Sequence, residues 1–297
     1  MRKITLAVIL LSVLGFLGWY LFIKPYDYLV TFKIKTTPGT INQILKLTNK
    51  KLQDSRIIAN PDLRNIKQEV VFNDSVFVFD WEIIPLTDST SKVKVYIKNE
   101  EHSLKNKLEV PFLNTDFKKR SVNTVLEFAK YLEDHIKSFK VTINGRDQLS
   151  GVYCIYVPIK CSQSDKANMM MKYYPDVSDF MVINRITSRG NPFVEITDWD
   201  MKNDSIQFNF CFPIVKKDSL PKDKLLKYKQ FKGLNNAIKA TYNGNYITSD
   251  RTWYALLDYA KENDIKIFET PVEVFHNNPN MGGDSMHWKT EVYMPIK

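Results

Sequence analysis

Val194-Glu195-Ile196 is followed 78 residues later by Val272-Glu273-Val274, a triplet with the same pattern. A second pair, Phe212-Pro213-Ile214 and Met294-Pro295-Ile296, is separated by 82 residues. Two copies of about 80 residues are too long and too few for a solenoid. The pairs therefore predict that the second half of the chain is an internal duplication.

The residues around these pairs favour the order strand, helix, strand, strand in each copy. Apolar runs between turn signals indicate the strands, and apolar residues at helical spacing indicate the helices. A charged stretch at 216–229 joins the copies. We expect a pseudo-twofold α/β domain with a concave surface between its halves, where pockets commonly form. The expected elements are strands at 153–159, 179–186, 192–196 and 204–214 with a helix at 164–174 that Pro175 ends, then strands at 231–242, 271–275 and 288–296 with a helix at 250–262 that Asp250 caps.

The part of the chain before this duplication predicts a sheet followed by a long helix. Alternating residues favour a strand at 26–35, and Pro38 stands where a helix begins. Residues 118–139 carry apolar side chains on one helical face and charged ones on the other. The order resembles the START-like helix-grip (SRPBCC, polyketide cyclase-like) superfamily over residues 26–142, which implies a hydrophobic cavity under the long helix. A generic α+β domain is the alternative. Further strands are expected at 65–72, 75–84, 92–98 and 108–112.

The end of the chain carries four motifs in a characteristic order. They are Ala-Thr-Tyr-Asn-Gly-Asn-Tyr at 240–246, Trp253 on a helix, Pro-Val-Glu-Val-Phe at 271–275 and Thr-Glu-Val-Tyr-Met-Pro-Ile at 290–296. Over residues 150–297 the chain resembles the GyrI-like small-molecule-binding domain, the effector-binding module of AraC-type and multidrug-sensing regulators. A START-like domain before it resembles a bacterial pairing. The chain departs from the regulators because no helix-turn-helix or other DNA-binding region precedes the domain.

The resemblance implies a ligand pocket between the two copies, lined by aromatic rings and containing an acidic residue. Glu291 is the first candidate acid and Glu273 the second. On a strand, Glu291 shares a face with Tyr293. The other candidate ligand contacts are Trp253, Tyr246 and Trp288, with Tyr174 and Trp199 as weaker ones. Each of these residues has a structural alternative, as a solvated strand residue or as core. Met169-Met170-Met171 either line a pliable pocket or fill the core.

Two chemistries suit a carboxylate beside aromatic rings. It attracts an organic cation by charge pairing and cation–π contact. It also serves as a general base when burial raises its pKa toward neutrality. The family includes hydrolases of strained small rings, so a hydrolase with Glu291 as its base is the rival to simple binding of an apolar or cationic compound. A membrane-tethered protein-interaction module is the third hypothesis.

The N-terminus predicts a membrane anchor. Residues 4–23 form a run without a charged residue, long enough to cross the hydrocarbon part of a bilayer. Trp19, Tyr20 and Lys24 lie at the far end of this run, as interfacial anchors would. A cleaved signal peptide is the main alternative. Arg2 and Lys3 favour a cytoplasmic N-terminus, so we expect a single-pass protein whose soluble part lies outside the cytoplasm.

Composition limits the remaining possibilities. The net charge is +9, of which residues 1–150 contribute +7 and residues 151–297 only +2, so nucleic acid is not an expected partner. The three cysteines are too few for a disulfide scaffold. The histidines, at 102, 135, 276 and 287, have no cysteine or carboxylate neighbours at metal-site spacing, and no nucleotide-binding fingerprint is present. We therefore expect no metal and no cofactor.

These observations give one architecture. The fold class is α+β, with an N-terminal transmembrane anchor at 1–25, a START-like helix-grip domain at 26–145 and a duplicated β-α-β-β GyrI-like domain at 146–297. A turn at Asn144-Gly145 marks the boundary between the soluble domains. The expected partners are a small-molecule ligand and, through residues 4–23, the lipid bilayer.

Overall fold

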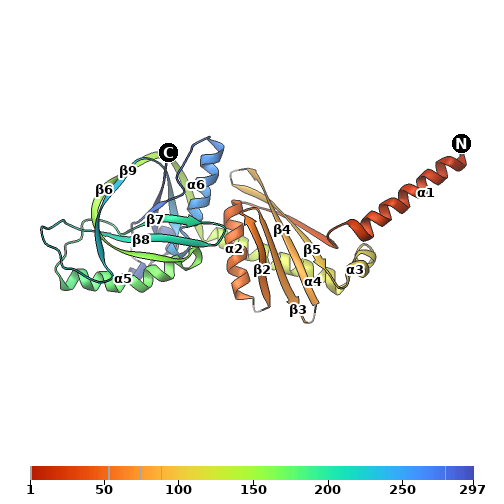
Figure 1. Ribbon diagram of the computed structural model, residues 1–297, viewed down its shortest axis with the longest axis horizontal. Helices are drawn as coiled ribbons and strands as arrows, with labels where there is room; N and C mark the ends of the chain where they lie inside the picture. Colours follow the sequence, from red (N-terminus) through yellow and green to blue (C-terminus); the bar gives the residue numbers. More distant parts are fainter. Residues whose placement is uncertain (1, 53, 74, 88, 278) are drawn as a thin grey trace. The chain divides into compact units, whose positions relative to one another are not determined.

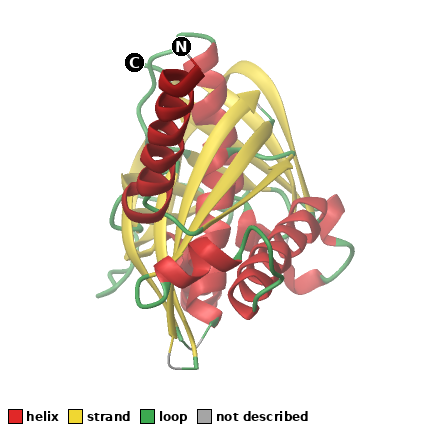
Figure 2. Cartoon of the chain, turned by 90° about the vertical axis from the view of Figure 1, so that its right-hand side faces the viewer, coloured by secondary structure: helices red, strands yellow, loops and turns green. Residues whose placement is uncertain are grey.

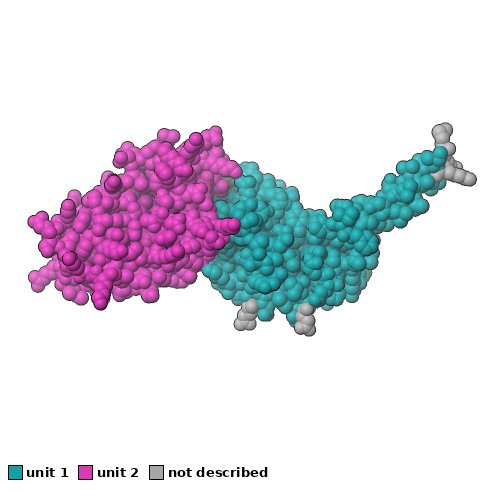
Figure 3. Space-filling model, in the orientation of Figure 1, with its two compact units in different colours: residues 1–133 teal, residues 134–297 magenta. Residues whose placement is uncertain are grey.

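The fold is given by a computed structural model (Figure 1), which describes every residue except 1, 53, 74, 88 and 278. Two compact units, Met1–Glu133 and Asp134–Lys297, make up the chain (Figure 3). The turn expected at Asn144-Gly145 is wrong. Both residues lie inside β6 (Phe139–Ser162), where the pairing register with the neighbouring strand shifts. Gly145 has a φ of 85°, a conformation that glycine adopts without strain.

The first unit begins with an apolar helix, α1 (Arg2–Gly18), which continues as a π-helical turn, η1 (Trp19–Ile23). Residues Ile4–Ile23 have a mean hydropathy of 2.4 and are not buried against the rest of the protein. By length and composition this helix is able to span a membrane. A single-pass anchor and a signal sequence share these properties.

The sheet of the first unit has five antiparallel strands in the order β1-β5-β4-β3-β2. It differs from expectation in two places. Residues 55–62 form an additional strand, and the strand expected at 108–112 is wrong, because a helix ends at Glu109 and a turn follows it. The elements are β1 (Tyr28–Ile34), α2 (Pro38–Lys51), β2 (Ser55–Asp62), β3 (Asn65–Phe72), β4 (Ser75–Thr87), β5 (Thr90–Asn99), α3 (Ser103–Glu109) and α4 (Asp116–Lys137).

The long helix α4 packs on this sheet through its apolar face. Phe117 meets Phe77 with ring centroids 5.0 Å apart, and Phe128 meets Trp81 at 4.9 Å. At these positions side chains fill the space between helix and sheet. The expected amphipathic helix is therefore confirmed, whereas the START-like resemblance remains a prediction.

The second unit is a closed barrel with the strand order β10-β11-β9-β6-β8-β7. Both copies run strand, helix, strand, strand, so the predicted duplication is present in the element order; Figure 2 shows the helices and strands. The long strands β6 and β9 pair with each other, and β7 pairs with β10 to close the barrel. The elements are β6, α5 (Lys166–Ile183), β7 (Phe193–Asp200) and β8 (Ser205–Pro213) in the first copy, and β9 (Lys227–Gly244), α6 (Arg251–Glu262), β10 (Val272–Phe275) and β11 (Lys289–Pro295) in the second, with short helical turns η2 (Gln163–Asp165), η3 (Tyr246–Thr248), η4 (Pro279–Met281) and η5 (Ser285–His287).

Two local expectations in this unit are wrong. Helix α5 continues through Pro175 to Ile183, so the strand expected at 179–186 is absent. Val177 and Met181 are buried four residues apart, and this helical spacing outweighs the hydrogen bond that proline removes. Asp250 precedes α6, but its side chain does not cap the helix. Its carboxylate accepts instead from Gln163 Nε2 at 2.7 Å.

Strand pairing also corrects the alignment of the repeated triplets. Glu273 lies opposite Val194, and Glu195 lies opposite Val272. Paired residues share a face of the sheet. The two glutamates that the triplets align therefore point to opposite faces. Glu195 contacts Lys229 and Asn209, whereas Glu273 faces helices α5 and α6.

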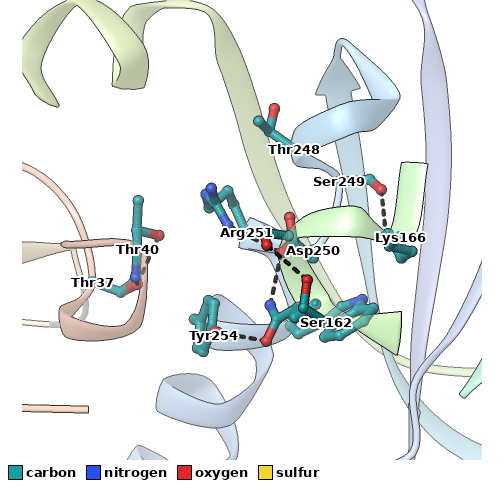
Figure 4. A network of polar contacts seen from close by, with 12 residues as sticks. Thr37, Thr40, Ser162, Lys166, Thr248, Ser249, Asp250, Arg251 and Tyr254 are labelled. Atoms are coloured by element: carbon teal, nitrogen blue, oxygen red, sulfur yellow. Dashed lines mark hydrogen bonds and ion pairs between the residues drawn. The ribbon is translucent and has the colours of Figure 1, made fainter. Parts of the chain in front are cut away.

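A buried ion pair joins the two copies. Lys166, the first residue of α5, donates from Nζ to Glu273 Oε2 at 2.6 Å and to Ser249 Oγ at 2.9 Å. The other carboxylate oxygen accepts from Trp253 Nε1 at 2.6 Å. The side chains of Lys166 and Glu273 are 1% and 0% exposed. Figure 4 shows Lys166 beside Ser249, with the hydrogen bond that connects the first copy to the second.

Removal of one partner of this ion pair is expected to destabilise the protein strongly. Glu273→Gln leaves the Lys166 ammonium buried without a counter-charge, which typically costs about 3–5 kcal/mol. Urea unfolding of the chain in detergent, followed by tryptophan fluorescence, measures the loss. As a control, Glu100→Gln breaks the exposed Lys98–Glu100 pair, and we expect it to change the unfolding free energy by less than about 1 kcal/mol. The double variant Lys166→Met, Glu273→Gln is expected to recover part of the loss. If it is no more stable than Glu273→Gln, an unpaired charge is not the cause.

Candidate functional site

The second unit contains a cavity of about 530 Å³ on the helical side of its sheet. Helix α5 forms one wall, and the turn η3 with the segment after β10 forms another. The lining is dominated by apolar and aromatic side chains, and its polar groups include three asparagine amides and one imidazole. The lining residues are Ala167, Met170, Met171, Tyr174, Pro175, Asn191, Pro192, Phe210, Asn245, Tyr246, Ile247, Phe275, His276, Asn277, Pro279 and Trp288.

Three aromatic rings gather at this cavity. The ring of Tyr246 lies 4.9 Å from that of Phe275 and 5.6 Å from that of Trp288, measured between centroids. The Tyr246 hydroxyl accepts from the backbone N–H of Asn277 at 2.9 Å and donates to the carbonyl of Lys289 at 3.1 Å. These bonds fix the orientation of the ring. Of the six predicted ligand contacts, Tyr246 and Trp288 thus line the cavity.

Glu273 and Trp253 lie beside the cavity. Glu273 belongs to the ion pair that joins the copies, and Trp253 donates a hydrogen bond to its carboxylate. Both are fully buried, and neither is a lining residue. Residues next to this ion pair do line the cavity. Phe275 lies two residues after Glu273 on the same face of β10, and Ala167 follows Lys166 in α5. Since Lys166 neutralises the carboxylate, Glu273 orders the cavity wall instead of presenting a free charge to it.

Glu291 and Tyr293 share one face of β11, as the strand periodicity predicts. This face is opposite to the face of the sheet that carries Glu273. Glu291 accepts from Lys289 Nζ at 2.8 Å, lies 3.1 Å from Lys239 Nζ, and accepts from the Tyr293 hydroxyl at 3.3 Å. Burial raises the pKa of Glu291, but hydrogen bonds from Lys289, Lys239 and His276 outweigh it and lower this pKa to about 2. The carboxylate is therefore ionised and compensated at neutral pH.

His276 connects the cavity to this charged cluster. Its Nε2 lies 3.0 Å from Glu291 Oε2, and its Nδ1 lies 3.1 Å from Asn191 Nδ2. A neutral imidazole satisfies both contacts when Nε2–H donates to the carboxylate and Nδ1 accepts from the amide. Both ring nitrogens are then occupied. Glu291 is not among the described lining residues, but it contacts His276, which lines the cavity wall.

Several site residues were not predicted as ligand contacts. Phe210 and Phe275 were expected only as strand residues, and Lys166 and Gln163 were not singled out. Gln163 Oε1 accepts from Trp199 Nε1 at 2.9 Å and from the Tyr254 hydroxyl at 3.1 Å, so Trp199 serves a structural network instead of the cavity. Met170, Met171 and Tyr174 do line the cavity. The methionine run was the available signal for this wall, and it lies on the helix that was expected at 164–174.

No protein-family model matches the sequence, and no curated protein matches it. Solved structures resemble part of the chain. The EcmrR chain in a complex with DNA is 16% identical over 60% of this chain and 63% of its own length, with a TM-score of 0.45, so the match spans less than two thirds of that protein. The C-terminal domain of EcmrR is 15% identical over 54% of this chain and 98% of its own length, with a TM-score of 0.43.

Other similar structures carry different descriptions. A hydrolase from Listeria innocua is 9% identical over 53% of this chain and 92% of its own length, with a TM-score of 0.35. SAV2435, solved with bound tetraphenylphosphonium, is 10% identical over 52% of this chain and 94% of its own length, with a TM-score of 0.36. Because every TM-score is below 0.5, we draw no conclusion about the function of this chain from these likenesses.

Proposed function

We propose that the second unit binds a small, largely apolar aromatic compound in the cavity beside α5. The observation that carries this proposal is the cavity itself, which has about 530 Å³ and is lined by Tyr174, Phe210, Tyr246, Phe275 and Trp288. Ligand pockets typically have about 300–1,000 Å³, with apolar walls and a few polar groups that orient the ligand. Here the amides of the lining asparagines are polar groups of this kind.

Charge compensation defines the class of ligand. No acidic side chain is among the described residues that line the cavity, and the nearby Glu273 and Glu291 are both paired with lysine. A cationic ligand would gain cation–π contact with the rings but would meet no free carboxylate. We therefore favour an uncharged compound over a cationic one. The flexible side chains of Met170 and Met171 suit ligands of varied shape.

The hydrolase hypothesis is disfavoured by the surroundings of Glu291. A general base works best when its pKa lies near the operating pH. The pKa of Glu291 is lowered to about 2 instead, and lysines occupy the space around its oxygens. The hypothesis of a pure protein-interaction module is disfavoured by the cavity, which side chains do not fill.

Blocking the cavity is expected to weaken binding of a neutral dye. The probe is N-phenyl-1-naphthylamine, titrated into residues 26–297 because detergent would absorb it. Met171 is 59% exposed and lines the cavity, so Met171→Trp adds bulk there with little effect on the core. If the new indole keeps about 60 Å² of the dye's apolar surface from being buried, the Kd of Met171→Trp for the dye rises roughly tenfold.

The matched control is Val182→Trp. Val182 is 74% exposed on the same helix and does not line the cavity. The Val182→Trp variant is expected to bind the dye with the same Kd as the unchanged chain. Equal affinities in all three proteins would rule out this cavity as the binding site.

The pH dependence of stability tests the assignment of Glu291. Its pKa is about 2 in the folded protein, below its ordinary value of 4.5. The stability that the ionised form contributes is present above pH 4.5 and is lost as the pH falls toward 2. Glu291→Gln is therefore expected to be less stable at neutral pH, and the difference should shrink below pH 4.5. Thermal unfolding across this range measures it. A difference that stays constant down to pH 2 would contradict the low pKa and reopen the general-base hypothesis.

The proposal includes membrane attachment through Ile4–Ile23, with residues 26–297 outside the cytoplasm. It also takes the second unit to be a GyrI-like domain. Arg2 and Lys3 support a cytoplasmic N-terminus. Alkaline phosphatase fused after Lys297 is then expected to be active in bacterial cells, and β-galactosidase at the same position inactive. The reverse pattern would place residues 26–297 in the cytoplasm.

A further inference from the structure

The segment that contains α3 exposes an unusual group of large apolar side chains. Leu104 and Leu108 lie four residues apart and therefore on one face of the helix. They are 50% and 57% exposed, and Phe112 and Leu113 in the turn after the helix are 87% and 56% exposed. Contiguous exposed apolar side chains often mark a surface that contacts a protein or a membrane. We call these residues the α3 patch.

Helix α3 is hydrogen-bonded to the end of the apolar helix. Lys107 Nζ donates to the carbonyl oxygen of Lys24 at 2.6 Å and to that of Leu21 at 3.2 Å. The Tyr20 hydroxyl donates back to the carbonyl of Lys107 at 3.2 Å. Lys107 is only 3% exposed. Its ammonium thus supplies donors to carbonyls at the C-terminal end of the helix, where the helical hydrogen bonds run out.

These bonds determine where the α3 patch lies relative to the apolar run. The run ends at Ile23, so Lys24 marks the boundary between hydrocarbon and headgroups if the helix spans a bilayer. Lys107 donates a hydrogen bond directly to Lys24. Leu108 is the residue after Lys107, and Leu104 lies one helical turn before Leu108. The patch therefore borders the point at which the chain would leave the membrane; Figure 1 shows α3 beside this end of the helix.

The other end of α3 is held on the sheet of the first unit. Ser103 Oγ donates to Asp27 Oδ1 at 2.5 Å, and Asp27 Oδ2 accepts from the backbone N–H of Asn99 at 3.0 Å. Asp27 is 1% exposed. The helix is thus tied to β5 at its start and to the apolar helix at Lys107. Its exposed face is presented in a fixed orientation, as a surface contact requires.

We propose that residues 103–113 form a second membrane contact, in which the α3 patch enters the headgroup region of the leaflet where the apolar helix ends. The proposal rests on the anchor proposed above. A bilayer is the occupant favoured by these contacts, because Lys107 fixes the helix that carries the patch to the end of the apolar run. Apolar side chains at this depth leave water while the polar face of a short helix stays hydrated.

Fluorescence quenching in phosphatidylcholine nanodiscs tests the contact with the full chain. Leu108 and Leu126 are both 57% exposed in the first unit, on α3 and α4, and form a matched pair of labelling sites. Each is changed to cysteine in a Cys161→Ser background and labelled with nitrobenzoxadiazole; Cys154 and Cys211 are buried. At position 108 we expect a blue-shifted emission and several-fold stronger quenching by lipids that carry a doxyl group near the headgroup. Equal quenching at 108 and 126 overturns the proposal.

Two further variants separate the possible reasons for failure. Val13→Cys, labelled in the same way, reports on the apolar helix and is expected to be quenched by doxyl groups deep in the acyl chains. If position 13 is not quenched, the anchor itself is wrong; if position 13 is quenched and position 108 is not, only the second contact is wrong. Leu104→Ser, Phe112→Ser and Leu113→Ser together are expected to abolish quenching at position 108. A blue shift at position 108 without doxyl quenching would indicate contact with a second copy of the chain and would also overturn the proposal.

Discussion

The buried pair of Lys166 and Glu273 is the contact on which the second unit depends most. It connects α5 of the first copy to β10 and, through Trp253 and Ser249, to the start of α6 in the second. Replacing a buried ion pair by apolar side chains is often neutral or stabilising, so its presence is weak evidence for stability as such. Its effect here is on geometry. The hydrogen bonds of Lys166 and Glu273 are formed in one relative position of α5 and β10. Residues of both elements line the cavity, so this position also determines the shape of its wall.

The distribution of charge around the cavity follows from the same principle. A poorly solvated carboxylate needs a positively charged or hydrogen-bonding partner. Each of the two candidate acids forms an ion pair with lysine. Glu273 is paired on the helical face of the sheet, and Glu291 on the other face with Lys239 and Lys289. What remains for a ligand is a surface of rings, thioethers and amides. This pairing explains why a resemblance that implied an acidic pocket leads here to a pocket with no free acid among its described lining residues.

The parts of this structure that were predictable are those that leave a periodic signal. Strand alternation and the repeated triplets indicated the duplication, and the apolar face of residues 118–139 indicated α4. Three kinds of information were not visible. Pro175 was read as a helix end, although burial of Val177 and Met181 carries the helix past it. The face of Glu273 depended on pairing between strands 78 residues apart. Lys166 had no sequence signal, because a lysine at the start of a helix is ordinarily solvated.

Two apolar surfaces of this chain differ in shape, and shape determines what each is able to contact. The cavity beside α5 is concave, so a compound of modest size touches several walls at once and loses most of its contact with water. The α3 patch is an exposed surface formed by a short helix and the turn after it, so a small molecule would touch one side of it and remain hydrated. Only an extended partner removes such a patch from water, and the hydrogen bonds of Lys107 place it at the end of the apolar helix. The cavity therefore suits a ligand and the α3 patch a bilayer, and the two surfaces belong to different units.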